Sequence, residues 1–508
     1  MAEHLMCELS VPGRVGVRFP DPDVPTTPLP EGMLRDDLPM PEMAEIDVIR
    51  YFTRLSQLNH SIDTGFYPLG SCTMKYNPKV NEEAARLPGF AFVHPLQPIE
   101  TAQGALALMH QLQEWLKEIG GFAGVSLQPA AGAHGELTGV LIIRAYHRSR
   151  GEKQRTKILI PDSAHGTNPA TSAMSGMQVV ELRSDPRGNI DLEALRAECD
   201  ETLAGLMLTN PNTLGLFDEN VEEVVRRVHE AGGLVYGDGA NMNALLGIVR
   251  PGDLGLDVLH YNLHKTFSTP HGGGGPGSGP VGVAAHLVDF LPDPVVGILE
   301  EGDEEDPPLY GLVHPSHTIG RVKAFHGHFG MFVRAYTYIR VHGPEGLRAI
   351  SEYAVLNANY LLARLRDTYH LPYDRVCMHE FVLEGRWPEA PEIHALDIAK
   401  RLMDYRFHPP TNYFPLIVHE ALMIEPTETE NKETLDAFAD AMIKIAEEAH
   451  TDPEVLKSAP HETPYGRMDE VRAAKALVLC CVTAYAQKEP VEMEVGDREK
   501  TSSPTQPL

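Results

Sequence analysis

The sequence lacks the long apolar stretch that a membrane-spanning helix requires. No uninterrupted apolar run of about 18 residues occurs, and the N-terminus shows no basic region followed by an apolar run, so neither membrane insertion nor secretion is expected. The six cysteines are scattered without a CxxC pair and indicate neither a disulfide framework nor a zinc site. A reducing compartment, the cytoplasm, is therefore predicted.

Basic residues are also scarce relative to acidic ones. The chain has 43 Lys and Arg against 71 Asp and Glu, a formal net charge of −28, and no basic block. Because binding to nucleic acid needs clustered positive charge, a nucleic-acid partner is not expected. With 508 residues, of which 43% are hydrophobic, the chain is long enough for a large core in two or more structural units.

Changes in composition and apolar patterning along the chain predict four regions. Residues 1–95 are predicted to form an extended arm and helices, since 11–45 are rich in proline and acidic residues; a disordered leader is the alternative. A large domain is expected over 96–334 and a smaller, helix-rich C-terminal domain over 335–487. Residues 488–508 lack an apolar pattern and are expected to be disordered.

The central region alternates between strand-like and helix-like segments. Apolar residues from Ala105 to Ile119 recur at helical spacing and stop at Gly120-Gly121. Short apolar runs predict strands at 157–161, 205–209, 233–239 and 257–264, and helices are expected near 134–148, 191–203 and 218–231. This alternation predicts an α/β fold with a mostly parallel sheet, whose ligands bind where the strands end.

Polar side chains follow each of these predicted strands. They are His165, Thr209 with Asn212, Asp238, and His264 with Lys265. A carboxylate after a strongly apolar strand is costly unless a cation or several donors meet it. Each residue taken singly fits an ordinary loop, but their joint placement favours a binding site.

A segment before the predicted helix at 134–148 has the character of an anion cradle. In "AAGAHGELTG", residues Gly132, Ala133 and His134 lie where backbone N–H groups and the helix dipole would converge. It matches neither a Walker loop nor a dinucleotide fingerprint.

These parts together are what pyridoxal phosphate requires: a lysine for the Schiff base, a phosphate cradle, a carboxylate for the pyridine nitrogen and a flat side chain on the ring. Lys265 stands in "NLHKTFSTPHGGGGPGSGP", 262–280. Residues without a Cβ allow the chain to pass close to a cofactor, so the glycine tract is predicted to be a wall of the active site.

Several segments resemble the glycine-cleavage system P-protein family, the glycine decarboxylases. They include "FYPLGSCTMKYNP" (66–78), "SAHGTNPA", "DGANMNA", the long stretch 250–283 around Lys265, "SHTIGRVKAF" (316–325) and "MIEPTETE" (423–430). The resemblance implies a fold type I pyridoxal phosphate enzyme, similar to aspartate aminotransferase, with a large cofactor domain and a smaller C-terminal domain.

The resemblance also implies residue roles. Lys265 is expected to form the Schiff base, Asp238 to pair with the pyridinium nitrogen, and His165 to stack on the ring. Contacts to the cofactor are expected from Gly132, Ala133, His134, Thr209, Asn212, Ala240 and His264, and from Thr318 and Gly320 across a subunit interface.

The family's long form has two homologous halves, and this chain is similar to the half that bears the lysine. The resemblance therefore implies subunit 2 of a split enzyme, paired with a lysine-less homologue as a heterotetramer of two of each; a homodimer is the alternative. The implied reaction is glycine catabolism by an oxidoreductase: decarboxylation of glycine and transfer of its aminomethyl group to the lipoyl arm of the H-protein, with release of carbon dioxide. Cys72 is expected near that arm or, more commonly for a single cysteine, in packing.

Other interpretations remain open at this point. Another fold type I enzyme, such as an amino-acid decarboxylase or a cysteine desulfurase, would share the lysine, aspartate and histidine. A non-catalytic scaffold subunit conflicts with Lys265. No metal is predicted, since "HPSHT" and "HGHFG" lack the spacing of a zinc site. Glu425, Glu428 and Glu430 suggest acid–base carboxylates, but a capped helix start with a solvated acidic face is the commoner explanation.

Overall fold

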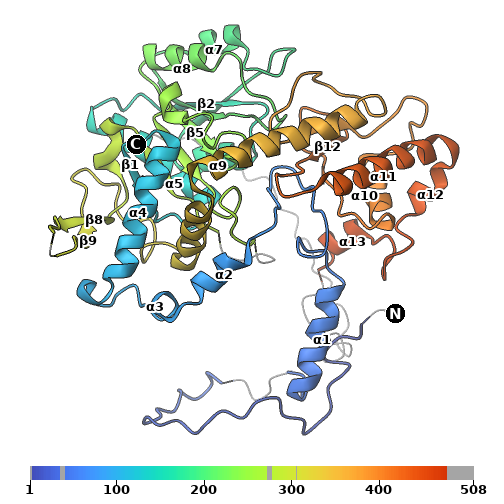
Figure 1. The fold of residues 1–508 in the computed structure, drawn as a ribbon, viewed down its shortest axis with the longest axis horizontal. Helices are drawn as coiled ribbons and strands as arrows, with labels where there is room; N and C mark the ends of the chain where they lie inside the picture. Colours follow the sequence, from blue (N-terminus) through green and yellow to red (C-terminus); the bar gives the residue numbers. More distant parts are fainter. Residues whose placement is uncertain (1–2, 35–39, 272–276, 305, 478–508) are drawn as a thin grey trace, which may run out of the picture. The chain divides into compact units, whose positions relative to one another are not determined.

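The computed structural model describes residues 3–34, 40–271, 277–304 and 306–477 (Figure 1). By their contacts the residues form two compact units, Met1–His60 with Pro464–Leu508, and Ser61–Thr463. The predicted disordered tail and positions 272–276 of the glycine tract lie outside the described residues. No helix within the described ranges is long and apolar enough to cross a membrane.

The first unit contains helices α1 (Glu45–Gln57) and α13 (Glu470–Lys475). The described residues between 11 and 44 form no helix or strand, as their proline content predicts. Acidic residues in the first turn of α1 and Arg54 in its last turn complement the helix dipole. Cys7 takes part in a disulfide, which the cysteine spacing did not indicate, whereas Cys72, Cys199 and Cys377 are free thiols.

A seven-stranded sheet organises the second unit. Its order is β1-β7-β6-β5-β4-β2-β3, and its strands are β1 (Gly124–Ser126), β2 (Lys157–Pro161), β3 (Gln178–Leu182), β4 (Leu203–Thr209), β5 (Leu234–Gly239), β6 (Val258–Tyr261) and β7 (Val281–Val283). The five strands from β3 to β6 run parallel, β7 runs antiparallel to β6, and β1 pairs antiparallel with β7. The predicted mostly parallel sheet is confirmed, although the last predicted strand ends at Tyr261 instead of residue 264.

Alternation along the strands divides the core between two faces. On one face Met207 and Tyr236 pack with α5 (Gly132–Ser149). On the other, Leu206 and Val235 pack with α4 (Gln103–Gly120) and α8 (Val221–Glu230). The strands are therefore buried on both sides, which explains their continuous apolar runs. Helix α4 ends as predicted, because Gly121 adopts a left-handed conformation with φ 77°.

The remaining elements around this sheet are short. They are α2 (Lys79–Ala85), α3 (Pro88–Ala91), η1 (Ile99–Thr101), α6 (Thr167–Met174), α7 (Leu192–Glu198), η2 (Pro251–Leu254), η3 (Ala285–Phe290) and the hairpin of β8 (Val295–Glu300) and β9 (Leu309–Val313). Helix α9 (Phe329–Leu365) follows and breaks at Gly343, which has φ 62° and precedes a proline.

The C-terminal part of this unit is a small antiparallel sheet with helices packed against it (Figure 1). The sheet has the order β10-β12-β11, from Phe381–Glu384, Ala421–Ile424 and Thr411–Asn412. The helices are α10 (Ala395–Asp404), α11 (Lys432–Thr451) and α12 (Pro453–Ser458). The first residue pair of the sheet, Phe381 opposite Ile424, sets the position of the glutamates that flank it.

Candidate active site

One cavity of about 220 Å³ gathers most of the predicted site residues. Its walls come from the ends of β2, β4, β5 and β6 and from the start of α5, the edge of a parallel sheet at which ligands bind. Nine of the twelve predicted residues line it: Gly132, Ala133, His165, Thr209, Asn212, Asp238, Ala240, His264 and Lys265. The structure brings these nine residues together, and their roles stay predictions.

The start of α5 forms a tight corner of this cavity. A Cβ on Gly132 would lie 2.7 Å from Oδ1 of Asn262, and a Cβ on Gly279 would lie 2.1 Å from the carbonyl oxygen of Ala131. Both positions therefore need glycine for close approach. Because the N-terminal cap residue Ala131 offers no side-chain hydrogen bond, the first N–H groups of the helix are open to an anion.

Several neighbouring groups stabilise the negative charge of Asp238 in the cavity. Asp238 is 7% exposed; the amide of Ala240 donates to its Oδ1 at 3.1 Å, and the Asn168 side chain donates to its Oδ2 at 3.4 Å. Although burial alone would raise it, the pKa of Asp238 is lowered, because the Ala240 amide and the charge of Lys265 favour the carboxylate and the polar ring of His260 faces it. Asp238 is therefore the ionised acid of the site.

His260 supports Asp238 from the neighbouring strand. Asp238 and His260 are directly paired residues of β5 and β6, and Nε2 of His260 lies 3.7 Å from Oδ1 of the carboxylate. Burial lowers the pKa of His260 to about 4, so the ring is neutral. The hydroxyl of Tyr236 lies 2.5 Å from Nδ1. With that hydroxyl as the donor, the ring proton stays on Nε2, facing Asp238.

A second carboxylate, Glu136, lies close to Asp238. Burial and the nearby charge of Asp238 raise the pKa of Glu136 to about 7. It accepts hydrogen bonds from the hydroxyls of Thr167 at 2.8 Å and Thr171 at 3.3 Å. The pKa values of the two acids are thus shifted in opposite directions, so that Asp238 is ionised and Glu136 favours its protonated form.

Lys265 is oriented by a loop far away in sequence. Its Nζ donates to the carbonyl oxygen of Ser71 at 2.7 Å. Beside it, His264 accepts a hydrogen bond from the amide of Ser278 at 3.2 Å, and burial lowers its pKa to about 3. His264 is therefore a neutral acceptor, and Lys265 is the cation that faces the cavity.

His165 borders the open side of the cavity. Although its side chain is exposed, the surrounding groups desolvate its ring and lower its pKa, which keeps the planar ring neutral. Three predicted residues do not line the cavity: His134, whose Nδ1 accepts from the Ala130 amide at 3.1 Å, and Thr318 and Gly320. Their contacts to a cofactor, two of which were expected across a subunit interface, stay predictions.

The prediction omitted several residues that line the cavity. They are Ser71, Glu136, Thr167, Pro211, Thr213, Asn241, Asn262, His379 and Glu380. Most stand inside or next to the motifs already quoted, so the same strand-end argument could have included them. His379 and Glu380 carry no such signal, because they precede a strand of the small antiparallel sheet.

The expected solvated acidic face at "MIEPTETE" is wrong for two of its glutamates. Glu425 is fully buried, and Glu428 forms an ion pair of 2.8 Å with the buried Lys75. Helix α11 begins only at Lys432 and is capped by Asn431 instead of a threonine, with the Asn431 side chain accepting from the Thr434 amide at 2.8 Å. The sequence pattern identified the acidic run 423–430 but did not indicate that Glu425 and Glu428 are withdrawn from solvent.

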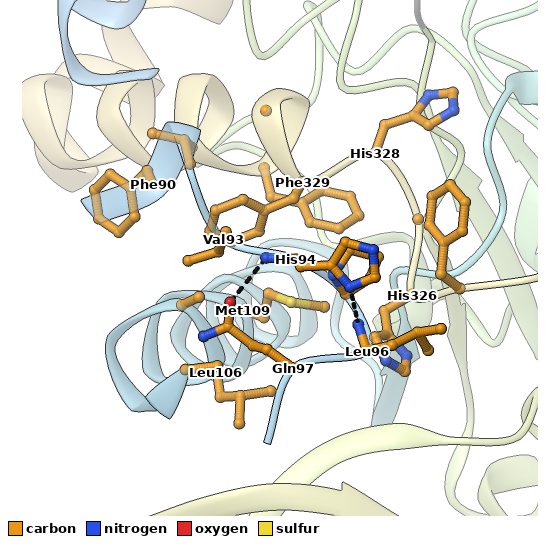
Figure 2. Close-up of a pocket in the computed structure, with 18 of the residues that line it drawn as sticks. Phe90, Val93, His94, Leu96, Gln97, Leu106, Met109, His326, His328 and Phe329 are labelled. Carbon is orange, nitrogen blue, oxygen red and sulfur yellow. Dashed lines mark hydrogen bonds between the residues drawn. The ribbon is translucent and has the colours of Figure 1, made fainter. Parts of the chain in front are cut away.

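A larger cavity of about 560 Å³ lies elsewhere in this unit. Figure 2 shows Phe90, Phe329, Leu106 and Met109 at its wall, with His326 and His328 nearby. Among the described residues that line it there is no lysine or carboxylate. It therefore lacks the groups of a Schiff-base site.

Comparisons with known proteins agree with this geometry. The family described as glycine dehydrogenase, C-terminal domain, matches residues 350–461, and aminotransferase class-V matches residues 136–274. A probable glycine dehydrogenase (decarboxylating) subunit 2 from Caldanaerobacter subterraneus is 58% identical, covering 94% of this chain and 98% of its own. The protein of the same description from Listeria monocytogenes is 55% identical, with coverages of 94% and 97%.

Solved structures show the fold. A crystal structure of glycine decarboxylase (P-protein) of the glycine cleavage system, in inhibitor-bound form, has a TM-score of 0.70 at 22% identity and covers 82% of this chain and 93% of its own. A cysteine desulfurase from Thermococcus onnurineus has a TM-score of 0.57 at 17% identity, with coverages of 76% and 97%. The predicted fold type I architecture is confirmed. At 58% identity over nearly its whole length, the chain belongs to the glycine dehydrogenase (decarboxylating) subunit 2 family.

Proposed function

We propose that this chain is the lysine-bearing subunit of a glycine-cleavage P-protein. It uses pyridoxal phosphate to decarboxylate glycine and transfers the aminomethyl group to the lipoyl arm of the H-protein. The observation that carries the proposal is the single cavity lined by both Lys265 and the ionised Asp238. The relatives at 55–58% identity are described as glycine dehydrogenases, which supports glycine as the substrate.

The cavity residues fit this cofactor. Oγ1 of Thr209 and Oδ1 of Asn262 are buried and have no hydrogen-bond partner among the described residues. Buried polar atoms of this kind are costly unless a ligand satisfies them. The corner at Gly132, with the free N–H groups of α5, suits the phosphate.

Each of the cavity residues would have its own role toward the cofactor. When bound, pyridoxal phosphate accepts the electron pair released as a bond to the substrate's α-carbon breaks. Lys265 would anchor it as a Schiff base. Asp238 would hold a proton at the pyridine nitrogen through its carboxylate, to which the Ala240 amide donates and which the neutral ring of His260 faces at 3.7 Å. His165 supplies a neutral ring beside the cofactor.

The partners follow from the same family. The proposed assembly pairs this chain with a homologous, lysine-less subunit 1 in a heterotetramer, with the lipoylated H-protein as co-substrate, in the cytoplasm. The descriptions of the relatives as subunit 2 support a partner subunit. A homodimer is the alternative that sizing of the co-expressed complex excludes or establishes.

The main rival is another fold type I enzyme. A cysteine desulfurase shares the fold, but at only 17% identity. Glycine-to-bicarbonate exchange measured with and without lipoylated H-protein separates the two, since only the proposed activity depends on that protein. Co-expression with subunit 1 should give exchange that needs the H-protein. Absence of exchange in a complex that contains bound cofactor would contradict the proposal.

A further inference from the structure

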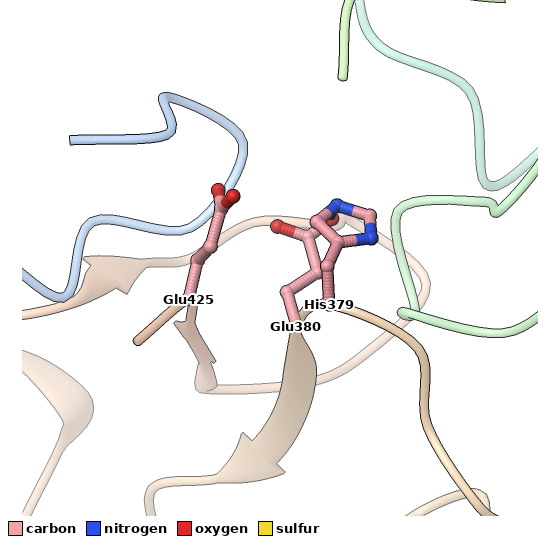
Figure 3. A group of neighbouring side chains, drawn as sticks. All are labelled: His379, Glu380 and Glu425. Carbon is pink, nitrogen blue, oxygen red and sulfur yellow. Dashed lines mark ion pairs between the residues drawn. The ribbon is translucent and has the colours of Figure 1, made fainter. Parts of the chain in front are cut away.

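Two buried glutamates meet at the edge of the cavity. Glu380 directly precedes β10 and Glu425 directly follows β12, and the antiparallel pairing of Phe381 with Ile424 places them opposite one another. They are 4% and 0% exposed. Their carboxylates and the ring of His379 offer atoms that all lie within 4.8 Å of one another (Figure 3). The sheet register therefore builds a carboxyl pair beside the cavity.

The hydrogen bonds around the pair are unequal. Glu425 accepts from three donors: the amide of Thr73 at 3.0 Å, its hydroxyl at 3.2 Å and the side chain of Asn241 at 2.7 Å. Within the described part of the chain Glu380 accepts one hydrogen bond, from the amide of Ser71 at 2.8 Å, and Nε2 of the neutral His379 lies 3.5 Å from its Oε1. Because donors stabilise a carboxylate, the negative charge of the pair belongs on Glu425 and a proton on Glu380.

The charged and titratable neighbours do not neutralise the pair. Burial lowers the pKa of His379 to about 3, so its ring is neutral, and its nitrogens have no hydrogen-bond partner among the described residues. Burial also raises the pKa of the Cys72 thiol, which therefore stays protonated. Before the cofactor binds, the ammonium group of Lys265 acts on both glutamates. Once Lys265 forms the proposed Schiff base, that ammonium group is consumed, and two adjacent buried carboxylates retain one proton between them.

We propose that Glu380 and Glu425 share a single proton, and that Glu380, which lines the cavity, delivers it to the sulfur that leaves when the lipoyl disulfide opens. The identity of the acceptor rests on the proposed function; the shared proton does not. Glu425 and His379 are positioning residues that keep the proton on Glu380. Burial and the charge of Glu425 raise the pKa of Glu380 to about 8, and burial raises that of Glu425 to about 7, in agreement with a retained proton.

The step balances. The C–C bond to the carboxylate of glycine breaks and carbon dioxide leaves, and the released electron pair forms a bond from the remaining carbon to one sulfur. The S–S bond breaks, and the second sulfur leaves with that bond's electron pair. It takes the proton of Glu380 and becomes a thiol, while Glu380 becomes a carboxylate. Solvent returns one proton to the pair in each turnover, because two adjacent buried carboxylates do not both stay ionised.

The same three side chains could instead hold a divalent cation, since carboxylates and a histidine are common ligands. The hydrogen bonds argue against this. Both oxygens of Glu425 already accept hydrogen bonds, one from Thr73 and the other from Asn241. A cation there would meet a carboxylate whose oxygens are occupied.

The test uses the cofactor-loaded complex with subunit 1. Infrared difference spectra detect the C=O stretch of a protonated carboxyl group and its titration with pH, independently of turnover. Wild type should show such a band. Glu136 and Glu430, whose pKa values are raised to about 7, contribute carboxyl bands of their own. Glu380→Gln should remove the component that titrates near pH 8, and Glu425→Gln should keep that component but move its midpoint to lower pH, because a like charge is gone. Glu430→Gln is the control: Glu430 is a half-buried acid outside the cavity, so this variant should leave the Glu380 component unchanged.

Turnover with lipoylated H-protein supplies the second readout. A required acid makes the rate fall as pH rises through its pKa, so wild type should lose activity above about pH 8. Glu380→Gln should lower the rate about a hundredfold, lack this alkaline limb and retain the Schiff-base absorbance. Glu425→Gln should shift the limb to lower pH.

Three results would overturn the shared proton or its role: no carboxyl band that depends on Glu380, an unchanged rate and pH profile in Glu380→Gln, or a tightly bound metal ion whose removal abolishes activity. If wild type shows the band but does not turn over glycine, the shared proton stands and the proposed function fails. If wild type turns over glycine but shows no carboxyl band that depends on Glu380, the proposed function stands and the shared proton fails.

Discussion

Lys265 and Ser71 are joined by a hydrogen bond of 2.7 Å from the ammonium nitrogen to the backbone carbonyl oxygen. They are 194 residues apart in sequence. The same Ser71 contributes its amide to Glu380 at 2.8 Å. One peptide segment thus touches both the lysine and the buried acid, and its backbone fixes both without using its side chain.

Replacement of Lys265 by alanine should abolish the visible absorbance of the Schiff base and lower glycine exchange about a thousandfold or more, because no other amine replaces it in the cavity. Absorbance spectra and exchange assays check this. Lys153→Ala, at an exposed lysine remote from the cavity, is the matched control and should leave both unchanged. An intact absorbance band in the Lys265 variant would exclude this residue as the anchor.

Asp238→Asn should keep the shape of the side chain and remove its charge. We expect the exchange rate to fall about a hundredfold or more, since an uncharged amide no longer holds a proton at the ring nitrogen. Steady-state rates and the absorbance spectrum of the bound cofactor measure this. Wild-type rates in Asp238→Asn would show that the carboxylate has no such task.

Gly279→Ala should damage the corner that we propose receives the phosphate. The added Cβ would meet the Ala131 carbonyl at 2.1 Å, so the start of α5 must move. A loss of about 1–3 kcal/mol in the free energy of unfolding is expected, with weaker cofactor binding. Denaturant unfolding and cofactor titration report the two effects. Gly277→Ala, whose nearest contact would be 3.3 Å, should change little.

Thr209→Val should separate ligand binding from stability. The Thr209 hydroxyl is buried without a partner in the described structure, so removing it should leave the cofactor-free protein equally or more stable. Cofactor affinity should fall about fivefold, the equivalent of about 1 kcal/mol for one hydrogen bond. Equal affinity for the cofactor would mean that the hydroxyl faces no polar group of the ligand.

Much of the fold and site follows from local sequence patterns. The apolar runs that became β2, β4 and β5 are each followed by a polar residue, and parallel strands bring their carboxyl ends to one edge. His165, Thr209 and Asp238 therefore met in the cavity as expected. Gly132 was predicted individually, and Gly279 lies in the glycine-rich stretch 262–280; at both, close backbone approach needs a residue without a Cβ.

The carboxyl pair could not be predicted in this way. Glu380 and Glu425 are 45 residues apart and stand on strands of a sheet whose pairing no local pattern specifies. An isolated glutamate in an acidic chain is usually solvated, and only the register of β10 against β12 shows that these two are buried together. Likewise, the short apolar run before Lys265 could not show that the strand stops at Tyr261.

The pairing of Asp238 with His260 across β5 and β6 links the charge of the site to strand alignment. Because side chains alternate between the two faces of a strand, a slip of a single residue would turn the imidazole away from the carboxylate. A chain that folded with this slip would keep every catalytic side chain in its sequence and yet present Asp238 without its imidazole neighbour. The correct pairing register of β5 and β6 is thus required for an active enzyme as well as for a stable one.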